Sequence, residues 1–197
     1  MREAEIKRNT KETKIDIKIN IDGKGIFSGK TPIPFFDHML THFSRYSMID
    51  LNIQAAGDIE IDGHHTIEDT GIVLGEAIKK AVGDKRGIYR FGNAVLPMDE
   101  TLVSVSVDFS GRPYFAYRGP SLSEMPGFGI YDAELTSEFL QKLSIHASLN
   151  LHVVVQYGEN RHHIHEAIYK AVGLSFRQAL EKDIRRGDEI PSTKGII

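Results

Sequence analysis

The chain has 197 residues, of which 41% are hydrophobic and 26% are charged, so it is long enough to bury a core of its own. Its formal net charge of -3 lacks the basic excess typical of proteins that bind nucleic acid or anionic membranes, so neither partner is expected. The absence of cysteine excludes disulfides, thiolate catalysis and sulfur-ligated zinc, and leaves His, Asp and Glu as the ligands for any metal ion.

The pattern of apolar residues predicts strands and helices in both halves of the chain. Residues 1–14 alternate charges without an apolar run, and no stretch approaches the roughly 20 apolar residues of a membrane span, so we expect a soluble cytoplasmic protein. Period-two alternation and β-branched runs predict three strands, at residues 15–21, 103–109 and 149–157. Apolar residues at three- and four-residue spacing predict two helices, at residues 70–82 and 167–180.

A motif of two adjacent histidines followed by a glutamate occurs twice. His64-His65-x-x-Glu68 recurs 98 residues later as His162-His163-x-x-Glu166, and the same shift pairs Gly75 with Gly173. Repetition at a fixed interval indicates a duplicated structural unit. We therefore predict an α+β fold with two similar halves, each a sheet backed by two helices, at residues 1–92 and 93–185.

The spacing inside each motif suits metal binding. On a helix, residues four apart lie on the same face, so the first histidine and the glutamate of each motif can grip one ion. The second histidine diverges by about 100° and must point elsewhere. Two ligand directions in each of two motifs suggest two metal ions shared between copies of the repeat, with His38 as a further ligand from the first half.

Nitrogen and oxygen ligands without sulfur suit Mn(II), although Zn(II), Co(II) and Fe(II) also accept imidazole. A single His-His pair is more often solvated surface, but its recurrence with Glu at the same offset favours a metal site. The remaining histidines lack a repeated counterpart. We expect His42, His146 and His165 at the surface or in a substrate pocket, and His152 as a packed or hydrogen-bonded ring on the strand at 149–157.

Seven motifs give the sequence a specific resemblance that covers almost the whole chain. They are Arg8-Asn9-Thr10-Lys11-Glu12-Thr13, Phe36-Asp37-His38-Met39-Leu40, Asp62-Gly63-His64-His65-Thr66-Ile67-Glu68-Asp69, Arg90-Phe91-Gly92, Asp108-Phe109-Ser110-Gly111-Arg112-Pro113, Asn160-Arg161-His162-His163-Ile164-His165-Glu166-Ala167 and Pro191-Ser192-Thr193-Lys194-Gly195. In combination they resemble the imidazoleglycerol-phosphate dehydratase family. The resemblance implies two fused ferredoxin-like repeats, and manganese that organises trimers into a homo-oligomer of 24 chains with sites between subunits.

The resemblance also divides the ligands between two Mn²⁺ ions per site. It implies that one ion is held by His38, His65, His162 and Glu166, and that the other is held by His64, Glu68 and His163. Many relatives have a further histidine ligand for the second ion at a position that is Glu138 in this chain. Because a carboxylate also coordinates Mn(II), Glu138 is expected to be the last ligand.

The reaction implied by the resemblance is the dehydration of D-erythro-imidazoleglycerol phosphate to imidazole acetol phosphate in histidine biosynthesis. Glu12 is the implied catalytic base, and residues 186–197 are the implied substrate-binding tail. Arg90, Arg112 and Lys194, with Ser192 and Thr193, match the family's phosphate-binding positions. The full substrate-binding set that the resemblance implies comprises Glu12, His38, His64, His65, Glu68, Arg90, Arg112, His162, His163, Glu166, Lys170, Ser192, Thr193 and Lys194.

Two other classes of function remain open for the same residues. A binuclear metallohydrolase would use these ligands to generate a metal-bound hydroxide that attacks a phosphoester. Alternatively, the metals would be structural pins of an oligomer or a storage site, although the evident strands argue against a four-helix bundle. A nucleotide-binding function has little support, because Gly-rich phosphate loops are absent.

Overall fold

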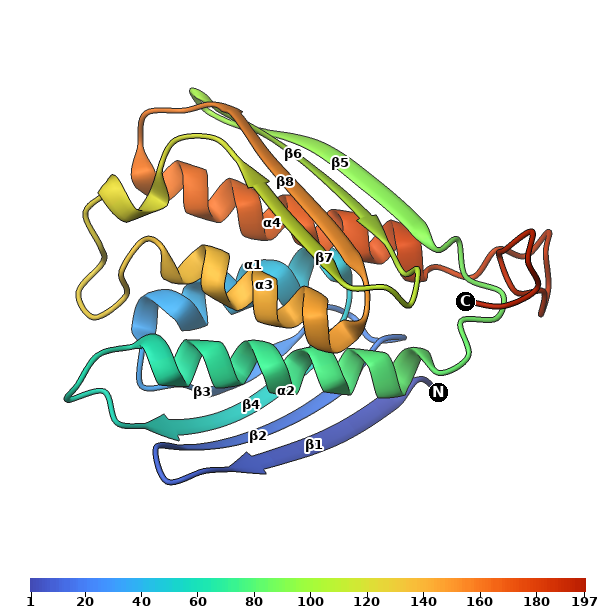
Figure 1. The fold of residues 1–197 in the computed structure, drawn as a ribbon, viewed down its shortest axis with the longest axis horizontal. Coiled ribbons are helices and arrows are strands. Elements are labelled where there is room, and N and C mark those ends of the chain that lie inside the picture. Colours follow the sequence, from blue (N-terminus) through green and yellow to red (C-terminus); the bar gives the residue numbers. More distant parts are fainter.

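A computed structural model describes residues 1–197 as two four-stranded sheets on the outside with helices between them (Figure 1). The first half contains β1 (Glu3–Asn9), β2 (Thr13–Asn20), β3 (Phe27–Lys30), α1 (Pro34–Ser47), β4 (Asp50–Gly57) and α2 (His64–Val82). The second half contains β5 (Phe91–Met98), β6 (Thr101–Asp108), β7 (Tyr114–Arg118), the 3-10 turn η1 (Leu122–Glu124), α3 (Leu135–Ala147), β8 (Asn150–Tyr157) and α4 (Arg161–Leu180).

The two sheets have the same topology. Their strand orders are β1-β2-β4-β3 and β5-β6-β8-β7. In each sheet the first two strands form an antiparallel hairpin, and the third strand runs parallel to the fourth, to which α1 or α3 connects it. The predicted duplicated α+β fold is therefore confirmed, with two helices packed on the inner side of each sheet (Figure 1).

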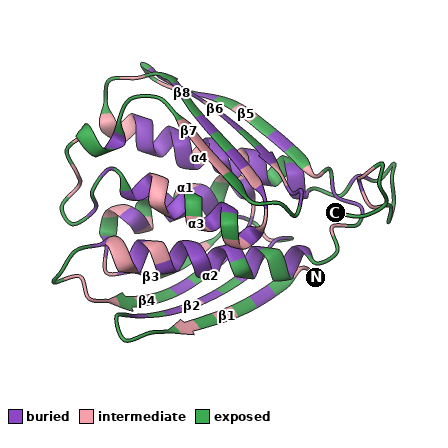
Figure 2. Cartoon of the chain, in the orientation of Figure 1, coloured by how far each residue is buried: buried purple, intermediate pink, exposed green.

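Alternating side chains give each sheet one buried face and one exposed face. On β2, Ile15, Ile17 and Ile19 are buried, while Lys14 and Lys18 are exposed on the outer face. β6 repeats the arrangement with inward-facing valines. Figure 2 shows the buried residues concentrated along the inner layers of both halves, where they form one continuous core. Burial of this apolar surface provides the main driving force for joining the two halves.

Each helix packs against a helix of the other half, α1 with α4 and α2 with α3. Glycine permits the close approach at matching positions of the two pairs. A Cβ at Gly75 would lie 2.7 Å from the Cβ of His146, and one at Gly173 would lie 2.9 Å from the carbonyl oxygen of Phe43. The repeated glycines therefore bring side chains of opposite halves within reach of one another.

The structure extends the predicted elements. Both predicted helices begin earlier than expected, at His64 and Arg161, so each histidine motif lies inside the first turns of its helix. The strands β1, β3, β4, β5 and β7 were not anticipated, and neither were the positions of α1 and α3. None of the helices combines the length and the apolar character that crossing a bilayer requires.

Candidate metal centres and phosphate pocket

The two histidine motifs are placed by the same local device at the start of α2 and α4. The side chain of Asp62 accepts a hydrogen bond from the backbone N–H of His64 at 2.7 Å, and that of Asn160 accepts one from His162 at 2.9 Å. Such side chains satisfy N–H groups that have no partner within the helix. Because the motifs are helical, the first histidine and the glutamate of each share one face.

The first cluster joins α1 to α4 and consists of His38, His162 and Glu166. The Nε2 atoms of His38 and His162 lie 3.4 Å and 3.0 Å from Glu166 Oε2. One ligand atom from each of the three residues lies within 4.8 Å of the others, a spacing at which they can hold a metal ion. The motif of the second half therefore takes its third potential ligand from a helix of the first half.

Two further side chains surround Glu166 in this α1/α4 cluster. His42 Nε2 lies 3.3 Å from Glu166 Oε1, and Lys170 Nζ lies 2.5 Å from the same oxygen. Burial lowers the pKa of His42 to about 4, so its ring is neutral at pH 7. Burial alone would raise the pKa of Glu166, but the hydrogen bond from Lys170 and the nearby histidines outweigh it and bring the pKa to about 2. The carboxylate is therefore ionised and available to a cation.

The second cluster joins α2 to α3 and consists of His64, Glu68 and Glu138. Their ligand atoms also lie within 4.8 Å of one another, with His64 Nε2 3.9 Å from Glu68 Oε2. Lys142, one turn after Glu138 on α3, lies 2.8 Å from Glu68 and 3.2 Å from Glu138. This α2/α3 cluster mirrors the α1/α4 cluster, with two carboxylates and one histidine in place of two histidines and one carboxylate.

The second histidine of each motif points away from its cluster, as the helical spacing predicts. His65 Nδ1 lies 3.0 Å from Asp58, and His163 Nδ1 lies 2.7 Å from Glu100. These hydrogen bonds raise the pKa values of both histidines. Metal-binding histidines commonly donate one ring N–H to a carboxylate, which fixes the ring and leaves the other nitrogen for the ion. In both residues Nε2 is free of any hydrogen bond.

Glu12 lies in the turn between β1 and β2, close to the second histidine of the first motif. Its Oε2 is 3.9 Å from His65 Nδ1, and the hydroxyl of Thr10 accepts a hydrogen bond from its backbone N–H. Its side chain is 56% exposed. Glu100 occupies the corresponding turn between β5 and β6, so the two hairpins present a carboxylate to the second histidine of each motif.

A pocket of about 600 Å³ lies between the C-terminal tail and the ends of the second sheet. Arg90 spans it, since its guanidinium contacts Asp108 at 2.7 Å and donates to the carbonyl of Pro191 at 2.9 Å. Arg112 makes no ion pair. The pocket thus collects all five predicted phosphate-binding residues, namely Arg90, Arg112, Ser192, Thr193 and Lys194.

Comparison with known proteins shows the family to which the chain belongs. The model of the family described as imidazoleglycerol-phosphate dehydratase matches residues 31–176. The chain belongs to that family. A dehydratase of this name from Leptospira biflexa is 55% identical over 96% of the chain and 95% of its own length, and one from Moorella thermoacetica is 50% identical over 100% and 98%.

Two solved structures of imidazoleglycerol-phosphate dehydratases have the same fold. The Staphylococcus aureus structure has a TM-score of 0.82 and 38% identity, and covers 92% of this chain and 99% of its own. The Pyrococcus furiosus structure, solved in complex with (S)-C348, has a TM-score of 0.81 and 36% identity, and covers 98% and 100%. The duplicated architecture is therefore that of solved imidazoleglycerol-phosphate dehydratases.

In this imidazoleglycerol-phosphate dehydratase family member the C-terminal tail, which lines the pocket, and the first turns of α2 and α4, which carry the motifs, lie at opposite ends of the molecule (Figure 1). The backbone N–H of Arg90 donates to the carbonyl of Ala179 at the far end of α4, whereas His162 lies in its first turn. At about 1.5 Å per residue, the length of α4 places Arg90 and His162 about 25 Å apart. One chain therefore does not bring its own clusters and its own pocket around one small ligand.

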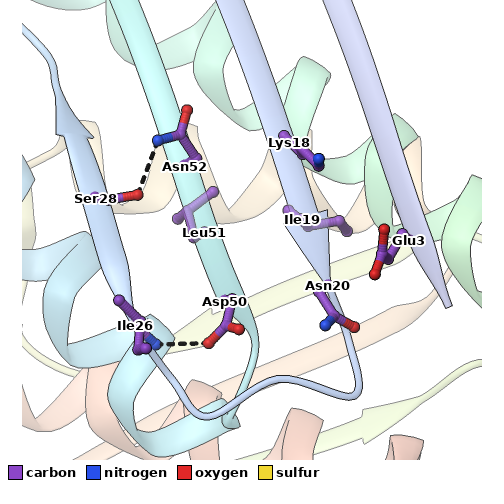
Figure 3. Close-up of a pocket in the computed structure, with 9 residues that line it drawn as sticks. All are labelled: Glu3, Lys18, Ile19, Asn20, Ile26, Ser28, Asp50, Leu51 and Asn52. Atoms are coloured by element: carbon purple, nitrogen blue, oxygen red, sulfur yellow. Dashed lines mark hydrogen bonds between the residues drawn. The ribbon is translucent and has the colours of Figure 1, made fainter. Parts of the chain in front are cut away.

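A groove on the outer face of the first sheet is separate from these sites (Figure 3). Some of its polar side chains are already hydrogen-bonded: Asn52 donates to Ser28 at 2.8 Å, and Asp50 accepts from the backbone N–H of Ile26 at 2.9 Å. No histidine lines it. Lys18 is the only cationic side chain that lines the groove, so the groove lacks the several converging donors that a phosphate would need.

Two of the remaining histidines, His165 and His152, depart from the sequence-based expectation, whereas His146 is partly exposed as expected. His165 is fully buried, not at the surface. Its Nδ1 and Nε2 lie 2.7 Å and 3.1 Å from the backbone carbonyl oxygens of Arg161 and Ala133, and a neutral ring donates to one of them at a time. His152 is exposed on the outer face of β8 beside Tyr114. No sequence pattern indicates the contacts of His42, Lys142, Asp58 and Glu100, which arise only when separate elements pack together.

Proposed function

We propose that the chain catalyses the manganese-dependent dehydration of D-erythro-imidazoleglycerol phosphate to imidazole acetol phosphate in histidine biosynthesis. The observation that carries the proposal is the pair of His and Glu clusters, each spanning two helices of opposite halves. The names of the similar proteins specify the substrate. The decisive experiment is turnover of this substrate by metal-stripped protein with and without Mn(II).

The ligand atoms of both clusters are imidazole nitrogens and carboxylate oxygens, a set that fits Mn(II). We assign one ion to His38, His65, His162 and Glu166, and the other to His64, Glu68, Glu138 and His163. His65 and His163 point away from the clusters of their own chain, so they would complete sites on neighbouring subunits. When bound, the two ions would supply Lewis acidity and a template for the substrate imidazole.

Glu100 is expected to orient His163 for metal binding. Replacing Glu100 with Gln should weaken one class of Mn(II) site about 10- to 100-fold, because a metal-binding imidazole loses its anionic hydrogen-bond partner. Mn(II) titration of the variant checks this, with Glu159→Gln as the matched control on an exposed carboxylate of the neighbouring turn. Unchanged affinity in Glu100→Gln would show that the contact has no part in binding.

Glu12 is the proposed base that removes the weakly acidic C–H proton of the substrate. The same elimination breaks the neighbouring C–O bond, and the hydroxyl leaves as water after gaining a proton. The resulting enol then tautomerises to the ketone. The exposed carboxylate near His65 supports this role, because it stands free to approach a substrate held at the metal ligands.

The tail at residues 186–197 and the adjoining ends of the second sheet are the proposed phosphate site. Arg112 carries the free guanidinium of the pocket, whereas Arg90 already contacts Asp108 and Pro191. Guanidinium groups suit phosphate because their donors match two of its oxygens at once. Lys170, beside Glu166, is the remaining proposed substrate contact and would lie at the metal end of the site.

Arg112→Ala is expected to raise KM about 10- to 100-fold and to leave the melting temperature unchanged, because it removes charge-assisted hydrogen bonds to the phosphate and no internal ion pair. Steady-state kinetics and thermal unfolding check the two parts. Arg185→Ala is the matched control, an exposed arginine outside the pocket. Wild-type kinetics for Arg112→Ala would remove the phosphate assignment.

Two features support the proposed assembly of 24 chains from trimers. The first is the separation between the clusters and the phosphate pocket, which a neighbouring subunit would close. The second is the outer face of the second sheet, where large apolar side chains are exposed, whereas β1 to β4 carry none. Those on the second sheet are Phe91, Val95, Tyr114, Val154 and Tyr157. Exposed apolar patches of this kind mark protein interfaces.

A further inference from the structure

An ammonium group contacts both carboxylates of the α2/α3 cluster. Lys142 reaches from α3 to both carboxylates of the cluster, with Nζ at 2.8 Å from Glu68 Oε1 and 3.2 Å from Glu138 Oε1. Its side chain is 25% exposed. In the absence of a metal ion it neutralises part of the repulsion between the two carboxylates. One oxygen of Glu68 and one oxygen of Glu138 therefore already contact a cation of the chain itself.

The α1/α4 cluster uses its lysine differently. Lys170 contacts only Oε1 of Glu166, and the other oxygen faces the rings of His38 and His162. The position on α2 that corresponds to Lys170 is Ile72, so the α2/α3 cluster has no cation there. His42 stands on α1 where Lys142 stands on α3, one turn after His38 and Glu138 respectively. Only the α2/α3 cluster thus has a cation that bridges two of its three ligands.

We propose that Lys142 is an internal competitor for the metal ion of the α2/α3 cluster and makes this site the more readily exchanged of the two. An ion that binds His64, Glu68 and Glu138 meets the charge of the ammonium within a few ångströms, which is unfavourable unless the ammonium withdraws. The flexible, partly exposed lysine stem permits withdrawal into solvent, at the cost of both ion pairs. The inference rests on the proposed function, because it requires that both clusters bind metal.

The test is a titration of metal-stripped protein with Mn(II), in which free Mn(II) is followed by its electron paramagnetic resonance signal. Lys142→Met should tighten one class of site about tenfold and leave the other class unchanged; the factor is modest because a partly exposed ion pair is weak. Lys142→Arg should keep the wild-type affinities. Lys80→Met, which removes an exposed charge from α2 away from the cluster, is the matched control. His64→Ala identifies the α2/α3 class by its loss.

The outcomes separate this inference from the proposed function. Fewer than two bound ions per wild-type chain would contradict the proposed function. Two classes of site that Lys142→Met leaves unchanged, or one class that it weakens, would overturn the role of Lys142 alone. Circular dichroism of each variant establishes that the fold is retained. Tightening confined to the class lost in His64→Ala, and absent from Lys80→Met, is the expected result.

Discussion

Glu12→Gln is expected to lower kcat by about 10²- to 10⁴-fold, the usual contribution of a positioned general base. The amide retains the size of the side chain but does not accept a proton at neutral pH. Because Glu12 is exposed in a turn and is not assigned as a ligand, Mn(II) content and melting temperature should stay at the wild-type values. Steady-state turnover, metal analysis and thermal unfolding measure the three quantities.

Glu5→Gln provides the matched control on the adjacent strand. Glu5 is an exposed carboxylate of β1 that pairs with Lys7 at 3.0 Å and lies outside the proposed site. Its replacement should leave kcat unchanged. A kcat for Glu12→Gln close to that of Glu5→Gln would move the base to another residue, with Glu100 in the corresponding turn as the first candidate. A large loss of bound Mn(II) would instead assign Glu12 to metal binding.

The duplication could be predicted because the motif and Gly75 recur after the same interval, and strands with one buried face were visible where alternation is regular. The strand β1 was hidden by its composition. Its inward positions, Ala4, Ile6 and Arg8, form no apolar run, since the strand lies at the edge of its sheet. Edge strands commonly carry charged residues, which weakens the pattern on which sequence analysis depends.

The candidate ligands within one helix followed from spacing, because residues four apart on a helix share a face whatever the rest of the chain does. The residues that contact these ligands from other helices and turns could not be predicted from spacing. His42 and Lys142 enter the clusters only through the packing of α1 on α4 and of α3 on α2, and Asp58 and Glu100 reach the second histidines from turns. No local pattern encodes such contacts between separate elements.

Removal of metal is expected to lower turnover by at least about 10³-fold. Lewis acidity and templating together are worth several kcal/mol of barrier, and each 1.36 kcal/mol is a factor of ten. Assembly should fail in the same step, because each ion is proposed to join ligands of different subunits. Chelation followed by dialysis prepares the protein, and sizing by light scattering reports the particle. Mg(II) is the control ion, since it is a hard cation that prefers oxygen ligands.

The most direct test of the account is the turnover of imidazoleglycerol phosphate by this metal-stripped protein as Mn(II) is restored, with bound ions per chain and particle size recorded together. We expect two ions per chain, growth from a small to a large particle, and formation of the ketone product only with Mn(II). Assembly without turnover would contradict it and leave the metals as structural pins. Release of inorganic phosphate in place of the ketone would indicate a hydrolase.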